Sequence, residues 1–256
     1  MLAINRQEKI LKLLNDKGFV KVSELSRLFD VSEETIRRDM EKLDKQGLLQ
    51  KIHGGATLVG EVNDVPPVSQ RKEINMDSKR AIAEEAIKFI NPGDSFILDS
   101  GTTTLIMAQL LPDIEVSVIT NDINIAYELS NRERINLILT GGTQRKGSYS
   151  LVGPETESFF DAYNVQKLFL SASGIRLEQG LTVSNPLEAH IKKKAMSSAQ
   201  EIFCLADSTK FGKSALVTFA AIHSIHRFIT DSSVGGKYRK YFQETGIDLI
   251  IVEEEK

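Results

Sequence analysis

Residues 23–55 read SELSRLFDVSEETIRRDMEKLDKQGLLQKIHGG, and this stretch decides the fold of the N-terminal part of the chain. Ser23 and Ser32 each precede a short run with apolar residues at helical spacing, and serine is a favoured helix N-cap. Only two residues separate the runs. Two short helices joined by so tight a turn are typical of a helix-turn-helix. The first run is expected to form one apolar face from Leu25, Leu28 and Phe29.

The helix predicted after Ser32 has one apolar and one polar face. Ile36, Met40 and Leu43 stand at i, i+4 and i+7 and predict a stripe that packs against the rest of the domain. Arg38 lies on the opposite face of the same helix. Such a helix can pack by one face and enter the major groove of DNA with the other. Taken alone, the pattern fits an ordinary surface helix with a solvated charge run equally well.

The segments on either side of this pair of helices complete the predicted domain. Residues 4–14 place apolar side chains at helical spacing and predict a first helix, which Gly18 ends. Residues 48–59, LLQKIHGGATLV, predict two short strands that turn at the two central glycines. Three helices followed by a hairpin form a winged helix, so we predict a winged helix-turn-helix domain over residues 1–58. His53 at the hairpin tip could contact DNA or simply be a surface histidine.

The distribution of charge is compatible with this prediction. The net charge is −3, but residues 1–60 carry 11 Lys and Arg against 9 Asp and Glu, whereas the remaining residues carry 21 against 26. A mild positive excess suits nucleic acid. It is too small for a purely electrostatic binder, so shape and base contacts must contribute.

The composition excludes several other classes of protein. A single cysteine, Cys204, cannot form an internal disulfide, and its place in the apolar run IFCLAD favours a buried structural thiol. The N-terminus has no apolar signal core, and no apolar run is long enough to cross a bilayer. We therefore expect a cytoplasmic protein without a membrane partner, and nothing in the sequence indicates a metal or another cofactor.

A second domain follows a polar segment. Residues 59–75 include two adjacent prolines, show no sustained period and predict a linker. From residue 76 to the end, short apolar runs alternate with polar, glycine-containing loops and helices. This alternation predicts an α/β domain over residues 76–256 with a mostly parallel sheet covered on both faces. In such sheets the loops after the strands converge on one rim, where ligands bind.

The chemistry of these loops indicates an anionic ligand. The run 99–104, DSGTTT, ends a strand and opens a helix, so that a glycine, hydroxyl groups and helix N–H groups come together. The run lacks the spacing of nucleotide-binding glycine motifs, and an elaborate helix cap is the alternative interpretation. Arg145, Lys146 and Lys210 add cations after other strands.

The N-terminal sequence resembles one known family. The stretches RQEKILKLL and KVSELSRLFDVSEETIRRDMEKLDKQGLLQKIHGGA are similar to the N-terminal signature of the DeoR family of bacterial regulators, and TIRRDMxKL followed by HGGA is the most diagnostic part. Membership in this family implies a repressor more often than an activator. It also implies that the following residues face DNA: Ser32, Thr35, Arg37, Arg38, Lys51 and His53.

The resemblance continues through the second domain and covers nearly the whole chain. LDSGTTT, LTGGTQRKGSYSLVGP, NPLEAHIKKKAM and LADSTKFG are similar to the effector domain of the same family, which is related to ribose-5-phosphate isomerase. In the isomerase the hydroxyl loop and the lysine segment hold the sugar phosphate. Loop placement and resemblance together give this predicted effector-binding set: Asp99, Ser100, Gly101, Thr102, Thr103, Thr104, Asn121, Asp122, Gly141, Gly142, Arg145, Lys146, Ser173, Gly174, Glu188, Asp207 and Lys210.

One departure from the isomerase decides between receptor and enzyme. The isomerase carries two aspartates in a DGADE segment, whereas residues 171–175 here read SASGI and contain no carboxylate. Glu188 matches the isomerase base, but proton transfer between adjacent carbons needs a positioned acid and base. We therefore predict no enzymatic activity. The resemblance implies a repressor of carbohydrate genes that is homo-oligomeric, as a dimer or tetramer, and that binds operator DNA and a sugar or polyol phosphate. The alternative is an isomerase-like enzyme that uses Asp99, Glu188, Lys192 and Lys210.

Overall fold

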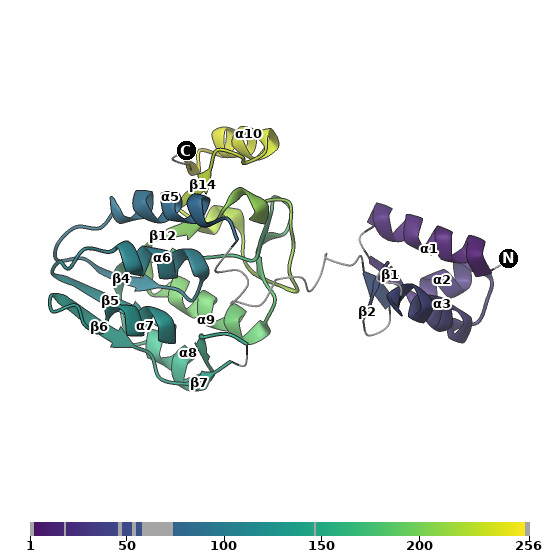
Figure 1. Cartoon of the computed structure of the whole chain (residues 1–256), viewed down its shortest axis with the longest axis horizontal. Coiled ribbons are helices and arrows are strands. Elements are labelled where there is room, and N and C mark those ends of the chain that lie inside the picture. Colours follow the sequence, from purple (N-terminus) through teal and green to yellow (C-terminus); the bar gives the residue numbers. More distant parts are fainter. Residues whose placement is uncertain are drawn as a thin grey trace. The chain divides into compact units, whose positions relative to one another are not determined.

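The chain divides into two compact units, Met1–Asp64 and Val65–Lys256 (Figure 1). The computed structural model describes residues 3–17, 19–45, 48–52, 55–57, 74–145 and 147–253. Each unit has its own apolar core. Most of the predicted linker, 59–75, lies outside the described residues, so its extent stays a prediction.

The N-terminal unit is a winged helix, as predicted. Three strands form an antiparallel sheet in the order β1-β3-β2, and the first of them, which lies between the first two helices, was not predicted. The elements are α1 (Ala3–Lys17), β1 (Phe19–Lys21), α2 (Val22–Phe29), α3 (Glu33–Lys45), β2 (Gln50–Ile52) and β3 (Gly55–Thr57).

Two details of α2 differ from the prediction. The helix begins at Val22 with Lys21 as its N-cap, so Ser23 lies inside the helix and the predicted cap is wrong. The helix begins directly at the end of β1, and Val22 is buried. Leu28 is also not part of the buried face, because 63% of its surface is exposed. The stripe that packs inward is Val22, Leu25 and Phe29.

The predicted cap of α3 is confirmed. The Thr35 N–H donates to Ser32 Oγ at 3.2 Å, which satisfies one of the free donors of the first turn. Ile36, Met40 and Leu43 are buried, as the periodicity predicts.

A buried ion pair fixes α3 against α1. Arg6 Nε donates to Asp39 Oδ2 at 2.5 Å, and the two side chains are 8% and 5% exposed. Gln7 Nε2 donates to the other carboxylate oxygen at 2.8 Å. The carboxylate therefore has donors on both oxygens, which offsets part of the cost of burying it. The pair sets which face of α3 points inward.

The C-terminal unit is built on a seven-stranded, fully parallel sheet. The strand order is β15-β14-β12-β9-β4-β5-β6. The strands are β4 (Ser95–Leu98), β5 (Val116–Thr120), β6 (Ile135–Leu139), β9 (Val165–Leu170), β12 (Ala199–Leu205), β14 (Arg227–Asp231) and β15 (Asp248–Val252). The helices are α5 (Met76–Ile87), α6 (Thr102–Leu110), α7 (Ile123–Leu129), α8 (Pro154–Phe160), α9 (Pro186–Ser197) and α10 (Gly236–Thr245).

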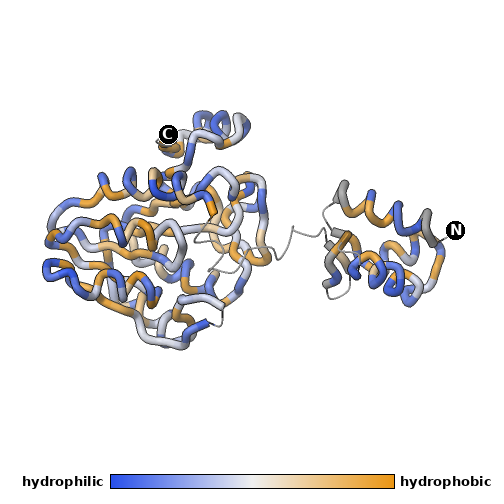
Figure 2. Tube along the Cα trace, viewed as in Figure 1, coloured by the Kyte–Doolittle hydropathy of each residue, from blue (hydrophilic) through white to orange (hydrophobic). Residues whose placement is uncertain are grey.

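Helices cover both faces of this sheet, and the predicted α/β architecture is confirmed. One apolar core includes residues of α5, α6 and α7, and the other includes residues of α8, α9 and α10. Phe96 and Leu98 of β4 enter the first core, whereas Ile97 between them enters the second. Strands buried on both faces are apolar at successive positions (Figure 2). Cys204 on β12 is fully buried, and burial raises the pKa of its thiol, in keeping with the predicted structural role.

Two small sheets extend the strand–helix framework. Strands β10 (Gly174–Arg176), β11 (Gly180–Val183) and β13 (Val217–Ala220) form one, and β7 (Thr143–Gln144) pairs with β8 (Leu151–Val152). Both were unpredicted, because such short strands have no readable period.

The order of the strands places a crevice in the middle of the large sheet. From β4 the chain steps outward to β5 and β6 on one side, and then to β9, β12, β14 and β15 on the other. The neighbours β4 and β9 therefore stand where the direction of winding reverses. Loops that leave the carboxyl ends of two such strands diverge and open a ligand-binding crevice.

The ion pair of the N-terminal unit gives a prediction about stability. Asp39→Ala leaves the Arg6 guanidinium buried without its carboxylate, so we expect a loss of about 3 kcal/mol of stability in that unit. Urea denaturation of the full chain followed by circular dichroism would measure it. The matched control is Glu41→Ala, because Glu41 is 52% exposed in an i,i+4 pair with Lys45 on the same helix and should cost under about 0.5 kcal/mol. Equal effects of the two substitutions would contradict the role given to Asp39.

Candidate functional site

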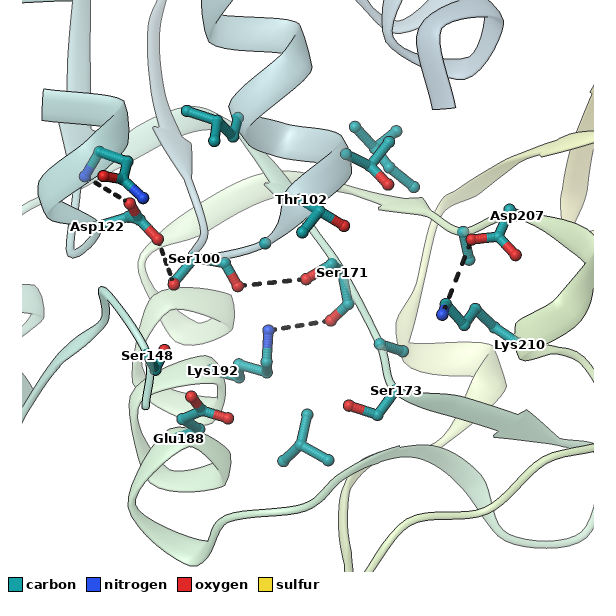
Figure 3. Close-up of a pocket in the computed structure, with 18 residues that line it drawn as sticks. Ser100, Thr102, Asp122, Ser148, Ser171, Ser173, Glu188, Lys192, Asp207 and Lys210 are labelled. Atoms are coloured by element: carbon teal, nitrogen blue, oxygen red, sulfur yellow. Dashed lines mark hydrogen bonds and ion pairs between the residues drawn. The ribbon is translucent and has the colours of Figure 1, made fainter. Parts of the chain in front are cut away.

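A pocket lies at the carboxyl ends of the strands, where the winding of the sheet reverses (Figure 3). The loops after β4, β5, β9 and β12 line it, together with α9 and the segment after β7. Nine residues of the predicted effector set contribute: Ser100, Gly101, Thr102, Thr103, Asp122, Ser173, Glu188, Asp207 and Lys210.

The loop after β4 brings the N-terminus of α6 to the pocket. Gly101 is the N-cap of this nine-residue helix, and Thr102 and Thr103 form its first turn. The first N–H groups of a helix have no intrahelical acceptor and favour an anion. Thr104 points elsewhere, because its Oγ1 donates to the carbonyl oxygens of Asp99 at 2.6 Å and Gly101 at 3.0 Å. Ser100, Gly101, Thr102 and Thr103 thus form the pocket side of this loop.

A buried ion pair forms the floor of the site. Asp99 Oδ2 accepts a very short hydrogen bond from Lys192 Nζ, and both side chains are 5% exposed. The same oxygen accepts from Ser171 N at 3.0 Å and Ser171 Oγ at 3.1 Å. Lys192 Nζ also donates to the Ser171 carbonyl at 3.0 Å. These bonds join the ends of β4 and β9 to α9. Asp99 lies under the pocket and is not part of its lining.

Asp122 holds the loop after β5 in place. Its Oδ1 caps α7 by accepting from Asn124 N at 2.8 Å and Ile125 N at 3.2 Å, and Ser100 Oγ donates to its Oδ2 at 2.5 Å. Burial raises the pKa of the Asp122 carboxyl, although the hydrogen bonds from Ser100 and from the backbone favour the ionised form. The pocket thus has a carboxylate at this side.

Glu188 supplies a second carboxylate, from the first turn of α9. Its Oε1 accepts from Arg145 Nε at 2.8 Å and from Ser150 Oγ at 3.1 Å. Arg145 therefore reaches the site through Glu188, as the prediction of converging loops requires, but it does not line the pocket. Ser148, from the same segment, does.

Asp207 and Lys210 form the opposite wall. Both belong to the loop after β12, and Lys210 Nζ lies 3.8 Å from Asp207 Oδ2 (Figure 3). Asp207 Oδ1 accepts from Thr209 N at 3.1 Å and caps the short turn 208–210. A lysine and a carboxylate thus face the α6 N-terminus across the pocket.

Several residues of the predicted set serve the scaffold around the pocket. Asn121 Nδ2 donates to the Leu151 carbonyl at 3.1 Å, and the Gly141 carbonyl accepts from Thr156 Oγ1 at 2.5 Å. Gly142 has a φ of +121°, and Gly174 faces the backbone of Lys213, where a Cβ would lie 2.5 Å from the carbonyl oxygen. None of these lines the pocket. Lys146 lies outside the described residues.

The predicted effector set missed several residues of the pocket. Lys192, Ser171, Ser148 and Asn124 line it, among others. Lys192 was assigned only to the alternative enzyme, although it stands at i+4 from Glu188 and thus shares its helix face. Ser171 and Ser148 were left out of the predicted set, because their approach to the pocket depends on strand order.

The polar face of α3 is the second candidate site, in the N-terminal unit. Arg37 and Arg38 are 56% and 75% exposed and form i,i+4 pairs with Glu33 and Glu34. Thr35 is half-buried and Lys51 exposed; Ser32 is exposed. His53 lies outside the described residues. The face that the sequence assigned to DNA is thus presented to solvent.

Fold and sites together define a class of protein: a winged-helix DNA-binding head joined to an α/β domain with a ligand pocket. The chain matches the family model described as the DeoR-like helix-turn-helix domain over residues 6–62 and that of the DeoR C terminal sensor domain over residues 74–232. The chain belongs to the DeoR family and is a DNA-binding transcriptional regulator.

Relatives along the whole chain agree with this assignment. The uncharacterized HTH-type transcriptional regulator YulB of Bacillus subtilis is 40% identical over 98% of both chains. The putative aga operon transcriptional repressor of Escherichia coli O157:H7 is 34% identical over 97% of this chain and 94% of its own. The L-fucose operon activator of Haemophilus influenzae is 33% identical over 96% and 99%. These relatives are regulators rather than enzymes.

Among solved structures, ribose 5-phosphate isomerase A of Methanocaldococcus jannaschii is similar with a TM-score of 0.40 and 20% identity, over 54% of this chain and 55% of that chain.

No helix in the part of the chain that the structure describes combines the length and apolarity needed to span a bilayer.

The close approach of Gly101 to Ser171, just after the ends of β4 and β9, gives a second prediction. A Cβ at Gly101 would collide with Ser171 Oγ and lie 3.1 Å from Thr104 Oγ1. Overpacking of this kind costs about 1–3 kcal/mol, so Gly101→Ala should lower Tm by on the order of 5 °C and distort the pocket. Thermal unfolding by circular dichroism would test it. Gly141→Ala is the control, because a Cβ there meets open space. A Gly101→Ala protein as stable as the control would refute this packing.

Proposed function

We propose that this regulator is a repressor of carbohydrate genes whose sensor domain binds a phosphorylated sugar or polyol in the pocket between β4 and β9. The observation that carries the proposal is the combination, in one pocket, of the α6 N-terminus and Lys210 with the carboxylates of Asp122, Glu188 and Asp207. The first two features favour an anion, and the carboxylates favour a ligand rich in hydroxyl donors.

The position of the positive charge supports binding of the phosphate near α6 and Lys210. Lys192 is already paired with the buried Asp99, so its charge is compensated inside the protein. Lys210 pairs with Asp207 at 3.8 Å in the wall of the pocket, and 23% of its side chain is exposed. An ammonium group so placed can approach a phosphate that also accepts from the N–H groups of Thr102 and Thr103.

The remaining groups suit a polyol. Ionised carboxylates accept hydrogen bonds and donate none, whereas serine hydroxyls do both. Ser148 and Ser173 line the pocket beside Glu188. A hydroxylated carbon chain that extends from the phosphate toward Glu188 would find acceptors along its length. The relative named the L-fucose operon activator is consistent with a carbohydrate ligand.

For DNA, we propose that α3 enters the major groove with Arg37 and Arg38 as its main contacts. Ser32 and Thr35 would reach bases or phosphates from the helix N-terminus, and Lys51 and His53 would contact the backbone from the wing. Helix-turn-helix proteins bind two half-sites as dimers, so we propose a homo-oligomer, either a dimer or a tetramer, that acts in the cytoplasm. Repression is proposed because a relative named a repressor aligns over nearly the whole chain.

The DNA proposal predicts the effect of a single arginine. Arg38→Ala should lower the affinity for an operator selected from random-sequence duplexes roughly fivefold to 150-fold, because an Arg–base contact contributes about 1–3 kcal/mol. Gel shifts over a range of salt concentrations would measure it. Arg80→Ala is the matched control, since Arg80 pairs with Glu84 at i,i+4 on the exposed face of α5. Loss of binding in both variants, or in neither, would argue against a groove-reading α3.

The effector proposal predicts a separate phenotype for the pocket lysine. Lys210→Ala should weaken sugar-phosphate binding roughly tenfold to a hundredfold, the value of a charge-assisted hydrogen bond, and leave operator affinity unchanged. Calorimetry with ribose 5-phosphate, fructose 1-phosphate, glucose 6-phosphate and glycerol 3-phosphate would measure it. Lys213→Ala, a nearby exposed lysine outside the pocket, should bind like the wild type. Unaltered binding by Lys210→Ala would disprove the proposed anion subsite.

A further inference from the structure

Two hydrogen bonds attach residues 74 and 75, which directly precede α5, to the sensor domain. Residues 74 and 75 are the last two residues of the predicted linker, 59–75, and the structure describes both. The rest of that linker, residues 59–73, is the connecting segment. The Ile74 carbonyl accepts from Lys79 Nζ at 2.6 Å, and Lys79 is a lysine of only 3% exposure. Asn75 Nδ2 donates to Asp207 Oδ1 at 3.2 Å, across 132 residues of sequence. The second contact leads to the wall of the effector pocket.

Asn75 departs from the usual behaviour of a helix cap. It is the N-cap of α5, yet its side chain makes no capping bond and its backbone is left-handed, with a φ of 53° and a ψ of 46°. The capping residues of α7 and α9, Asp122 and Asn185, use extended backbone and accept two N–H groups each. Asparagine is one of the few residues that tolerate the left-handed region. The side chain of Asn75 is therefore directed at Asp207 instead of at its own helix.

Asp207 has one occupied and one unsatisfied oxygen. Its Oδ1 accepts from Asn75 Nδ2 and from both the backbone N–H and the Oγ1 hydroxyl of Thr209. Its Oδ2 is buried and accepts no hydrogen bond from any residue that the structure describes, although the Lys210 ammonium lies 3.8 Å away. The side chain as a whole is 1% exposed and lines the pocket. A buried carboxylate oxygen without a donor is costly, and a ligand hydroxyl that reaches it would remove that cost.

We propose that Asn75 is a positioning residue that couples occupancy of the pocket to the place where the connecting segment enters the sensor domain. This inference rests on the proposed function. A hydroxyl of the bound sugar phosphate donates to Asp207 Oδ2 while the phosphate draws Lys210 away from that carboxylate. The carboxylate moves, and Asn75, bound to its other oxygen, moves with it. Residues 74–75 then direct the connecting segment differently in the two states, which changes how well paired DNA-binding heads fit an operator.

The experiment separates binding of the effector from its transmission. Asn75→Gly keeps the left-handed backbone accessible and removes the side chain, so the fold should persist. Effector affinity, by calorimetry with the same four phosphates, should stay within about threefold of wild type. The ratio of operator affinities with and without the phosphate should fall toward one from the roughly 5- to 150-fold range of allosteric coupling. Because coupling is reciprocal, the affinity for the phosphate should also become the same with and without operator DNA.

Met76→Gly is the matched control, since it adds the same backbone freedom one residue later, at an exposed side chain. It should keep the wild-type ratio. A wild-type ratio in Asn75→Gly, alongside a responsive wild type, overturns the role of Asn75 alone. An equal loss in both glycine variants also overturns it, because backbone freedom then explains the effect. A wild-type chain that responds to none of the four phosphates overturns the proposed function itself, and the coupling with it.

Discussion

The ion pair between Asp99 and Lys192 is the interaction on which the sensor domain depends. It lies where the winding of the sheet reverses, and with Ser171 it joins the ends of β4 and β9 to α9. Burying two charges is favourable only when further hydrogen bonds satisfy them, and Ser171 supplies both donors and an acceptor. The pair holds open a crevice that diverging loops create. The pair also neutralises Lys192 in the floor of the pocket, so the positive charge for an anionic ligand must come from another residue.

The DNA-binding head uses the same device on a smaller scale. The pair of Arg6 and Asp39 orients α3 about its own axis, and the apolar stripe of Ile36, Met40 and Leu43 completes the orientation. Arg37 and Arg38, adjacent in sequence to Asp39, are consequently left on the outside. In both units a buried ion pair fixes a helix that contributes residues to the candidate site. A buried ion pair thus determines, in each unit, which side chains of that helix reach the candidate site.

Asp207 belongs both to the lining of the pocket and to the contact that holds the residue before α5. Asp207 lines the pocket, and its Oδ1 accepts a hydrogen bond from Asn75, which stands next to the connecting segment. In the proposed coupling, signal transmission needs no long route through the sheet, because a regulator needs only an element with two arrangements that both ligands bias. In this proposal the loop after β12, which carries Asp207, moves relative to the parallel sheet, which stays fixed.

Local patterns were enough to predict the winged helix and the parallel sheet, because helical periodicity and apolar strands are read from adjacent residues. The nine predicted residues that line the pocket came from the placement of the loops together with the family resemblance. Two local predictions for α2 were wrong. Lys21 and not Ser23 is the N-cap, because the helix begins directly after β1, and Val22 and not Leu28 belongs to the buried face. Strand order brought Ser171 beneath the β4 loop and Asn75 against Asp207. Contacts between residues far apart in the chain depend on how the whole sheet winds, and only the folded domain decides that.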